Sequence, residues 1–405
     1  MQNENEKIDK RHGFFILMSF CSYVVLSIPY TIQGSNAPVM MEYYGITASQ
    51  QGFIMTMQSV GALGAAFFIG LKGEKYNKIH SIAFGLLILC LACGTVGFAP
   101  PYLALLLIII VIGIGVSLID VMMNGVIPDI YPGKKNTVLP LVHAFYSAGA
   151  MLTPVFVTRL ADPAVPESFA RPYLLTGVVA AVVFALYLAG GRRIMADTPY
   201  IDMGAMKKRA TENPAEVFKT GRAWFFLSAG ILYFTFQFGS IMWLPTYAIE
   251  EMGTEFGTGG LLLTAFFAGS LPMRFLGPVL LRRLSPRLIF SLFGGAGAVL
   301  MLAALFSGSI SAMFVLVPAC GFVQGSSVAV FVLMCTEAFP GRTASAASIF
   351  SIASCIATMT APLWIGALSE HTGFRVPMVM ISCFLLLSAL LIFFFAKPKP
   401  AGAGA

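Results

Sequence analysis

Long apolar stretches alternate with short polar segments along the whole chain. A membrane-spanning helix needs roughly 17 to 25 predominantly apolar residues, and twelve stretches meet this requirement. They lie near residues 13–42, 50–71, 79–99, 102–129, 137–160, 172–191, 223–249, 257–281, 288–307, 311–338, 346–368 and 376–396. The pattern therefore predicts an all-α polytopic membrane protein with twelve transmembrane helices.

The composition indicates that these apolar stretches must lie in a membrane. Hydrophobic residues make up 58% of the 405 residues, charged residues 11%, and the mean hydropathy is +0.84. A water-facing domain has no core large enough to bury this much apolar surface, so the lipid bilayer must be its solvent. The polar stretch Met1 to His12 leads directly into the first apolar run without a cleavage site, so we expect an inserted, multi-pass protein of the cytoplasmic membrane.

Basic residues predict the orientation of the helices. Of the 25 Lys and Arg residues, 21 fall in the two termini and in the even-numbered loops. Arg159, Arg171 and Arg375 lie on the other side, and Arg274 lies within a span. By the positive-inside rule, both termini are expected in the cytoplasm. The net charge of +7 is then a topology signal, and we expect no binding to nucleic acid.

The two halves of the chain repeat each other. A shift of 208 positions places Gly113 on Gly321, Asp129 on Glu337, Pro132 on Pro340, Lys134 on Arg342, Pro154 on Pro362 and Asp162 on Glu370. We therefore predict an N-terminal six-helix half (1–190), a cytoplasmic central loop (191–222) and a C-terminal six-helix half (223–405). Parallel repeats of this kind are typical of transporters whose substrate site lies between the halves, near the middle of the membrane.

Asp120 is the only acidic residue placed well inside a predicted span. A charged side chain at the centre of a membrane helix costs about 2.5 to 3.5 kcal/mol, which makes its presence a functional hypothesis. Burial disfavours the charged carboxylate and opening to water favours it, so alternating access would load and unload one proton. His143, in the next apolar run, is a second candidate for a titrating group. These two residues are the predicted proton-coupling residues.

Polar and aromatic side chains recur on one face of several spans, for example Asp120 and Asn124 on the fourth. Amides match vicinal hydroxyl groups and aromatic faces stack on sugar rings, so these side chains suit an uncharged sugar or polyol. The predicted substrate-binding residues are Gln33, Asn36, Asn124, His143, Tyr146, Tyr233, Gln237, Trp243 and Gln324. The alternative is that such groups join membrane helices to one another by hydrogen bonds.

The loop after the second span carries a recognisable motif. Gly70, Glu74, Lys75 and Lys78 match the signature of the major facilitator superfamily, which the chain resembles, while Asn77 stands where a glycine is usual. The resemblance implies two six-helix halves with short basic loops that latch the cytoplasmic side. The predicted gating and structural residues are Glu74, Lys75, Lys78, Asp129, Arg274, Arg282, Glu337 and Arg342. Simple topology anchoring is the alternative for the basic loops, and an anion clamp on the substrate is the alternative for Arg274.

Within that superfamily the chain resembles the fucose and proton symporter family. The resemblance covers spans 4 and 5, with Leu139, Phe145, Ser147, Gly149 and Ala150, and the segment MRFLGPVLLRRLSP of span 8. The chain departs from the family pattern in two spans. The family's acid in span 1 falls at Gly34, and its Gln and Asn on span 5 are His143 and Tyr146.

The combined expectation is a secondary active transporter that moves a neutral sugar or polyol together with a proton. Proton-coupled export of amphiphilic compounds and sodium-coupled sugar uptake remain alternatives. The sequence contains no GxxxxGK[ST], HExxH or GxSxG motif, so we expect an ion gradient as the energy source and no enzymatic activity. We also expect no bound cofactor and a monomer, with the small-molecule substrate and the bilayer as partners.

Overall fold

The computed structural model describes residues 10–72, 76–130, 135–197, 215–339 and 343–396. Within these residues the chain is almost entirely helical, and the one β-bridge joins Asp162 to Val165. The helices of the first half are α1 (Lys10–Ser35), α2 (Ala37–Tyr44), α3 (Ala48–Lys72), α4 (Lys78–Val96), α5 (Tyr102–Ile130), α6 (Lys135–Leu160), the 3-10 helix η2 (Pro166–Phe169) and α7 (Ala170–Asp197). Those that follow are α9 (Ala215–Phe218), α10 (Gly221–Met252), α11 (Phe256–Leu280), α12 (Pro286–Phe306), α13 (Ile310–Gln324), α14 (Ser327–Ala338), α15 (Thr343–Thr372) and α16 (Arg375–Phe395).

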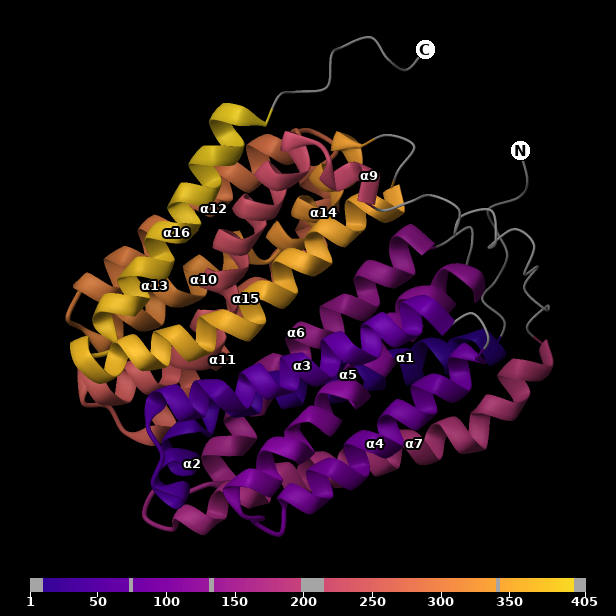
Figure 1. Cartoon of the computed structure of the whole chain (residues 1–405), viewed down its shortest axis with the longest axis horizontal. Helices are drawn as coiled ribbons and strands as arrows, with labels where there is room; N and C mark the ends of the chain where they lie inside the picture. The colour runs from indigo at the N-terminus through magenta and orange to yellow at the C-terminus, as the bar shows by residue number, and fades with distance from the viewer. Residues whose placement is uncertain (1–9, 73–75, 131–134, 198–214, 340–342, 397–405) are drawn as a thin grey trace.

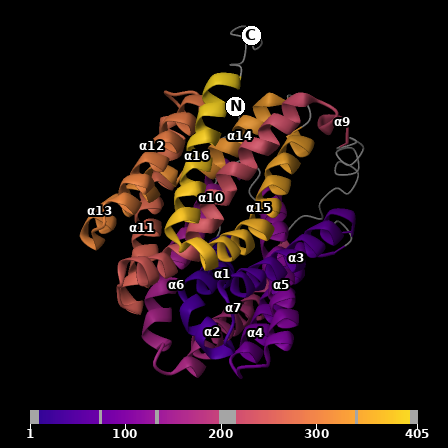
Figure 2. The ribbon, with the colours of Figure 1, turned by 60° about the vertical axis from the view of Figure 1, so that its left-hand side comes forward.

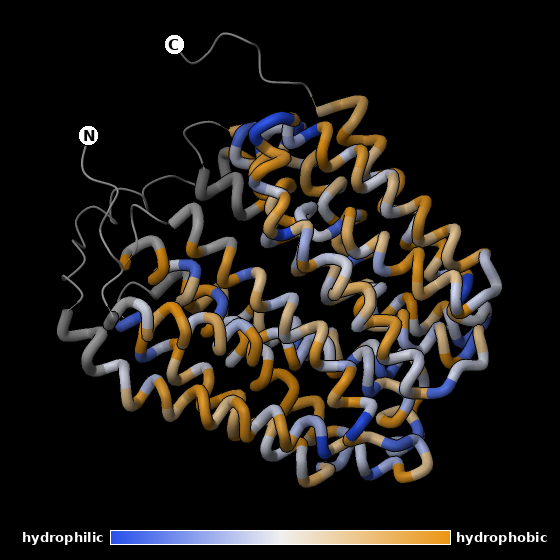
Figure 3. The backbone as a smooth tube through the Cα atoms, turned by 180° about the vertical axis from the view of Figure 1, so that it is seen from behind, coloured by the Kyte–Doolittle hydropathy of each residue, from blue (hydrophilic) through white to orange (hydrophobic). Residues whose placement is uncertain are grey.

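Twelve segments of the described chain are long and apolar enough to cross a membrane, which confirms the predicted fold class. Hydrophilic residues gather mostly at the ends of the bundle and hydrophobic residues along the helices (Figure 3). Two spans differ from the prediction. The first ends at Ser35 rather than near residue 42, because Pro38 fits only the first turn of a new helix, α2. The tenth is interrupted after Gln324, where α13 ends and α14 begins.

Buried apolar side chains form two separate clusters, one built from α1 to α7 and one built mainly from α9 to α16. Figures 1 and 2 show the corresponding helices as two bundles, indigo to magenta and red to yellow. Tyr30 and Tyr146 are packed against both clusters and so lie where the bundles meet. The domain limits drawn from the sequence stay a prediction, since most of the central loop lies outside the described residues.

The internal repeat is visible in helix packing. A Cβ atom on Gly113 of α5 would lie 1.9 Å from the carbonyl oxygen of Gln58 on α3. A Cβ atom on Gly321 of α13 would lie 2.0 Å from the carbonyl oxygen of Phe266 on α11. Both residues of the second contact are related to those of the first by the same shift of 208 positions. Only glycine permits this close approach of two helix backbones, so the repeat is structural as well as sequential.

The two bundles are joined at one end by a pair of hydrogen bonds that obey the same shift. Thr56 Oγ1 on α3 donates to the carbonyl oxygen of Met359 on α15 at 2.7 Å, and Thr264 Oγ1 on α11 donates to that of Met151 on α6 at 3.0 Å. In Figure 1 the bundles converge toward the end that holds α2, and they diverge toward the end where α1 begins and α16 ends. The protein therefore has a narrow end and a wide end.

Candidate functional site

A chain of hydrogen-bonded side chains surrounds Asp120 on α5. Its Oδ1 accepts a hydrogen bond from Tyr23 Oη on α1 at 2.8 Å and another from Asn124 Nδ2 at 3.2 Å. Asn124 Oδ1 lies 3.0 Å from His143 Nε2 on α6. The ring of Tyr23 also meets the imidazole edge to face, with centroids 4.9 Å apart. The carboxylate of Asp120 thus accepts hydrogen bonds from two neutral donors, Tyr23 and Asn124. The imidazole of His143 contacts the second of these donors.

Arg274 connects this network to the other half. Its Nη1 on α11 donates to the backbone carbonyl oxygen of His143 at 3.2 Å. The Nε atom is buried and has no partner among the described residues. The described partner of Arg274 is thus a carbonyl oxygen, and the side chain of Asp129 lies outside the described residues. The network therefore runs from α1 through α5 and α6 to α11 and crosses from one bundle to the other.

Helical spacing explains why these side chains meet. Asp120 and Asn124 are four residues apart and so share one face of α5. Phe20 of α1 stacks on Phe145 of α6 with ring centroids 4.0 Å apart, which fixes the two helices that present Tyr23 and His143. Asp120, Asn124 and His143 are half-buried, whereas Tyr23 is fully buried. The network is therefore anchored inside the bundle and retains some accessible surface on its polar members.

Gln237 of α10 is the predicted binding residue of the second half that keeps its amide available. It is half-buried and makes no hydrogen bond to any residue in the described parts of the chain. Close by, α1 crosses α10 so tightly that a Cβ atom on Gly34 would lie 2.2 Å from the carbonyl oxygen of Ile241. Gln237 on α10 and Tyr30 on α1 each lie about one turn from this crossing, on the side toward the wide end. Both are therefore placed near the meeting of the two bundles.

Gln33 and Asn36 are engaged within the first bundle. Gln33 Nε2 donates to Gln58 Oε1 on α3, and Asn36 Nδ2 donates to the carbonyl oxygen of Phe169 at 2.9 Å. Both side chains are fully buried, and each keeps one oxygen without a partner among the described residues. In this conformation their polar groups join neighbouring segments of the same bundle.

Three other predicted binding residues are engaged within the second bundle. Trp243 is fully buried, and its indole Nε1 donates to the carbonyl oxygen of Pro362 at 3.1 Å. Gln324 Nε2 donates to the carbonyl oxygen of Phe293 on α12 at 3.1 Å. Tyr233 lies in an aromatic cluster, edge to face with Phe290 at 5.4 Å. These contacts are those of helix packing, which was the alternative interpretation of polar residues in the spans.

The predicted latch is only partly visible. Glu74, Lys75, Arg342 and the side chain of Asp129 lie outside the described residues. Lys78 lies beside α5, since a Cβ atom on Gly125 would be 3.4 Å from its Nζ atom. Arg282 and Glu337 are exposed. No ion pair joins them to each other within the described chain, so the latch stays a prediction.

Sequence reasoning missed Tyr23, Gln58 and the two threonines of the narrow end. Tyr23 lies seven residues before Tyr30, so helical spacing already places it on the same face of the first span. Thr56 and Thr264 are identical residues related by the shift of 208 positions. The sequence therefore contained a signal for Tyr23, which is its helical spacing from Tyr30. It also contained a signal for the two threonines, which is their relation by the internal repeat. Gln58 had a signal of the same kind, because Gln51 lies seven residues before it and so shares its face of the span.

Comparison with known proteins places this architecture among membrane transporters. Protein TsgA of Shigella flexneri is 22% identical over 382 residues, covering 91% of this chain and 93% of TsgA. The crystal structure of the D-xylose-proton symporter has a TM-score of 0.75 and 14% identity, covering 95% of this chain and 97% of the other. The transporter FucP in its outward conformation has a TM-score of 0.66 and 16% identity, covering 96% of this chain and 99% of FucP.

The family model described as Major Facilitator Superfamily matches residues 17–320 and 251–405. These two matches together extend over nearly the whole chain and include every residue of the network around Asp120. The match confirms the superfamily that the loop motif predicted. The protein is therefore a multi-pass membrane protein with the architecture of a transporter. The chain belongs to the Major Facilitator Superfamily.

Proposed function

We propose that this protein is a secondary active transporter that moves a small polar solute, a sugar or a related polyol, by alternating access coupled to a proton. The observation that carries the proposal is the network from Tyr23 through Asp120 and His143 to Arg274, because it links a protonatable carboxylate to a contact between the two bundles. A structural acid inside one bundle would need no such connection.

Protonation of Asp120 would change this network directly. The charged carboxylate only accepts hydrogen bonds, whereas the protonated form also donates one. Oδ1 already accepts from Tyr23 and Asn124, and Oδ2 has no partner among the described residues. Oδ2 is therefore the proposed proton-binding atom. A new donor there would compete with the existing contacts of Asn124 and so disturb the position of His143, whose carbonyl group holds Arg274.

The proposed substrate site uses the polar groups that remain near the meeting of the bundles. These are Asn124, His143 and Tyr146 from the first half and Gln237 from the second. Hydrogen-bonding amides beside an aromatic ring suit a hydroxylated, uncharged ring. Symporters of D-xylose and of fucose are among the solved structures that share this fold, which supports the choice of substrate class. Gln33, Asn36, Tyr233, Trp243 and Gln324 take the role of supporting helix contacts in this conformation.

Orientation follows from the basic residues. With both termini in the cytoplasm, the wide end of the protein faces the cytoplasm and the narrow end faces outward. The described conformation is then inward-facing. The hydrogen bonds of Thr56 and Thr264 hold the outer side closed, and they must break before the protein opens outward.

The test is an uptake screen with purified protein in sealed liposomes, using pentoses, hexoses, deoxyhexoses and polyols. One arm imposes a proton gradient, a second imposes a sodium gradient, and a third imposes none. We expect accumulation of at least one sugar only in the proton arm. Accumulation in the sodium arm alone would show that the coupling ion is sodium and not a proton. Efflux of amphiphilic dyes without sugar accumulation in any arm would replace the proposal with export.

A further inference from the structure

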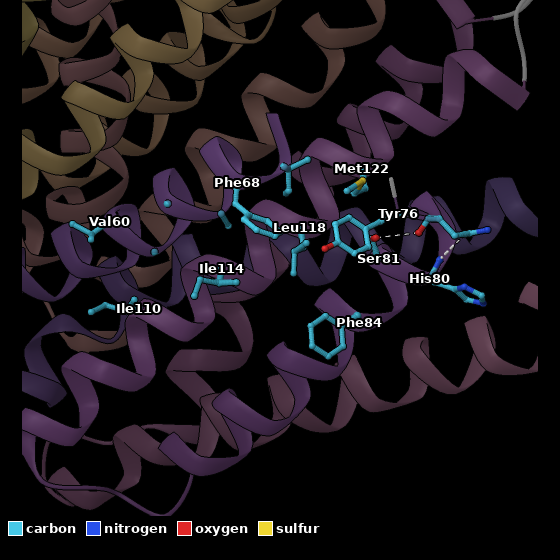
Figure 4. A pocket seen from close by; sticks show the side chains of 15 residues that line it. Val60, Phe68, Tyr76, His80, Ser81, Phe84, Ile110, Ile114, Leu118 and Met122 are labelled. Atoms are coloured by element: carbon cyan, nitrogen blue, oxygen red, sulfur yellow. Dashed lines mark hydrogen bonds between the residues drawn. The ribbon is translucent and has the colours of Figure 1, made fainter. Parts of the chain in front are cut away.

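The groove on the first bundle and the start of α14 on the second bundle differ in their polar groups. The groove has a volume of about 770 Å³ and is formed by α3, α4 and α5, and Figure 4 shows the side chains that line it. None of these described side chains has a buried polar atom without a partner. Several such atoms gather at the start of α14. Unpaired buried polar groups are costly, so this second place requires an explanation.

The tenth span is interrupted near its middle. Within the span Ile310–Ala338, α13 ends at Gln324 and α14 begins at Ser327. Helical bonding resumes where the N–H group of Val330 donates to the carbonyl oxygen of Ser326 at 3.0 Å. Ser326 makes no side-chain capping bond to the new helix. An α-helix leaves its first N–H groups unpaired, and its dipole favours an anion there, so α14 presents uncapped donors inside the membrane.

Three hydroxyl groups at this helix end are buried and unpaired. Ser326, Ser327 and Tyr233 are 5%, 1% and 0% exposed, and their oxygen atoms have no hydrogen-bond partner in the described parts of the chain. The ring of Tyr233 stacks on Phe331, one turn into α14, with centroids 6.4 Å apart. Its hydroxyl group lies near the side chain of Ser327. Packing thus fixes the ring of Tyr233, and its hydroxyl group stays free to bind.

Arg274 brings a positive charge to the same place. Its part of α11 packs on the interruption, since a Cβ atom on Gly277 would lie 2.8 Å from the Cβ atom of Ser326. The Tyr233 hydroxyl group lies within range of the guanidinium charge. Among the described residues, the guanidinium bonds to the carbonyl oxygen of His143 and makes no ion pair, and its Nε atom is unpaired. A cation in a span without a carboxylate partner is costly, so an anion from outside the protein would complete this arrangement.

We propose that Arg274, the Tyr233 hydroxyl group and the uncapped start of α14 bind a carboxylate of the transported solute, which is then a sugar acid. This inference rests on the proposed function, because the hydroxyl groups of the same solute occupy the proposed substrate site. The two sets of groups are adjacent, since Arg274 bonds to the backbone of His143. The planar guanidinium matches a carboxylate with two parallel hydrogen bonds. One cation balances the single charge of a carboxylate, whereas a phosphate carries about 1.5 to 2 charges.

The charge moved in each transport cycle follows from this assignment. A sugar-acid anion that enters with the proton of Asp120 moves no net charge, whereas a neutral sugar with that proton moves one positive charge. An inside-negative potential, set with potassium and valinomycin, should therefore leave the initial rate of sugar-acid uptake into liposomes unchanged at a fixed proton gradient. Sugar-acid uptake that such a potential accelerates would contradict the assignment.

Binding to the purified full-length protein is measured by calorimetry with matched probes. The pairs are glucuronate with glucose, galacturonate with galactose, and gluconate with sorbitol. In at least one pair the acid should bind at least about tenfold more tightly than its neutral partner, because hydrogen bonds to charged groups are the stronger ones. Acetate should bind more weakly than that acid, and equal binding would assign the site to a free anion and overturn the proposal.

The same measurements separate this inference from the proposed function. If neutral sugars are bound and accumulated while their acids are not preferred, the proposed function stands and the carboxylate site is overturned. If no member of any pair is bound or accumulated, both are overturned.

Substitutions then test the residues, with the acid that binds the wild type as the probe. Arg274→Gln should weaken its binding at least about tenfold, and Arg274→Lys less, because lysine keeps the charge and loses the fork. Ser327→Ala should weaken it about fivefold. The matched controls are Arg171→Gln, at an exposed arginine, and Ser382→Ala, whose buried hydroxyl group bonds to Met378 in its own helix at 2.8 Å. Both controls should bind the acid as the wild type does, and wild-type binding by Arg274→Gln or by Ser327→Ala would overturn the site.

Discussion

Asp120 is held by the hydroxyl group of Tyr23, and this bond gives the carboxylate its fixed position. Tyr23 is fully buried, so in the intact protein its hydroxyl group is shielded from water. Hydrogen bonds to charged groups contribute about 1.5 to 3 kcal/mol, roughly twice as much as neutral ones. The position of the Asp120 carboxylate therefore depends on a tyrosine from a different helix.

Tyr23→Phe should reduce proton-driven uptake at least about tenfold, because the carboxylate loses its strongest described donor while the ring packing is retained. Initial uptake rates in liposomes under a fixed proton gradient measure this effect. Tyr187→Phe is the matched control, since among the described residues its buried hydroxyl group accepts a hydrogen bond from Ser22 Oγ, at 3.1 Å, and makes no other. Equal losses in both variants would assign Tyr23 a packing role alone.

Some of the residue-scale picture could be predicted from the sequence. Asp120 and His143 stand out because an ionisable group in an apolar run has few explanations. Helical spacing identifies the face on which a residue lies, but it does not say which neighbouring carbonyl group that face meets. The spacing did not show, for example, that the N–H groups of Trp243 and Gln324 bond to carbonyl groups of adjacent helices, and the substrate role of these two residues stays a prediction.

At the scale of helices, the crossing of α1 and α10 brings the two bundles together beside the proposed site. Gly34 permits this contact, because any side chain there would meet the backbone of Ile241 and Met242. The family resemblance placed an acid at this position, and its absence leaves the crossing tight. The glycine at position 34 thus accounts both for the missing second carboxylate and for the close contact between α1 and α10.

Gly34→Ala should lower the unfolding temperature in detergent, because forcing a methyl group into a close backbone contact costs about 1 to 3 kcal/mol. Gly94→Ala in α4 is the control, since a Cβ atom there has no neighbour within 4 Å. It should raise stability slightly, by roughly 0.5 to 1 kcal/mol, through the better helix propensity of alanine. A Gly34→Ala protein as stable as wild type would show that the crossing relaxes freely.

Helix existence was predictable, whereas helix interruption was not. Long apolar runs identify the spans because lipid requires about 20 apolar residues for each crossing. Hydropathy does not register where a continuous run changes direction, as it does at Asn36 before α2 and between α13 and α14. Pro38 offered a local signal for the first of these breaks. Gly325 and Ser326 offered a weaker one for the second.

At the scale of the molecule, the repeat governs how the halves meet. The bonds of Thr56 to Met359 and of Thr264 to Met151 are related by the same shift that relates the two sequences. Glu370 adds a contact at the same end, where its Oε1 accepts from the backbone N–H of Ser49 at 2.8 Å. Asp162, its counterpart in the repeat, bonds instead within its own loop to Ala164. The threonine bonds at this end therefore follow the repeat, whereas the contact of Glu370 does not.

Replacing both Thr56 and Thr264 by Val should shift the protein toward its outward-open state. Each lost hydrogen bond weakens closure by about 0.5 to 1.5 kcal/mol, so the double variant should raise the open population roughly fivefold or more. Spin labels at Glu167 and Ser311, in a background without native cysteines, should report longer distances across the narrow end. The pair Thr153→Val and Thr176→Val is the control, because both hydroxyl groups bond within their own helices. If the variant with Thr56→Val and Thr264→Val has the same distance distribution as the wild type, these two hydrogen bonds do not hold the narrow end closed.

The central claim is that proton binding at Asp120 drives transport, and Asp120→Asn tests it most directly. Asparagine keeps an acceptor oxygen for Tyr23 but binds no proton, so the network remains while the titration is lost. In liposomes, the account predicts that the variant loses sugar accumulation under a proton gradient and loses substrate-dependent proton uptake. It should retain binding and exchange between equal pools of sugar, which shows that the protein is folded. Full proton-driven accumulation by a folded Asp120→Asn protein would contradict the account.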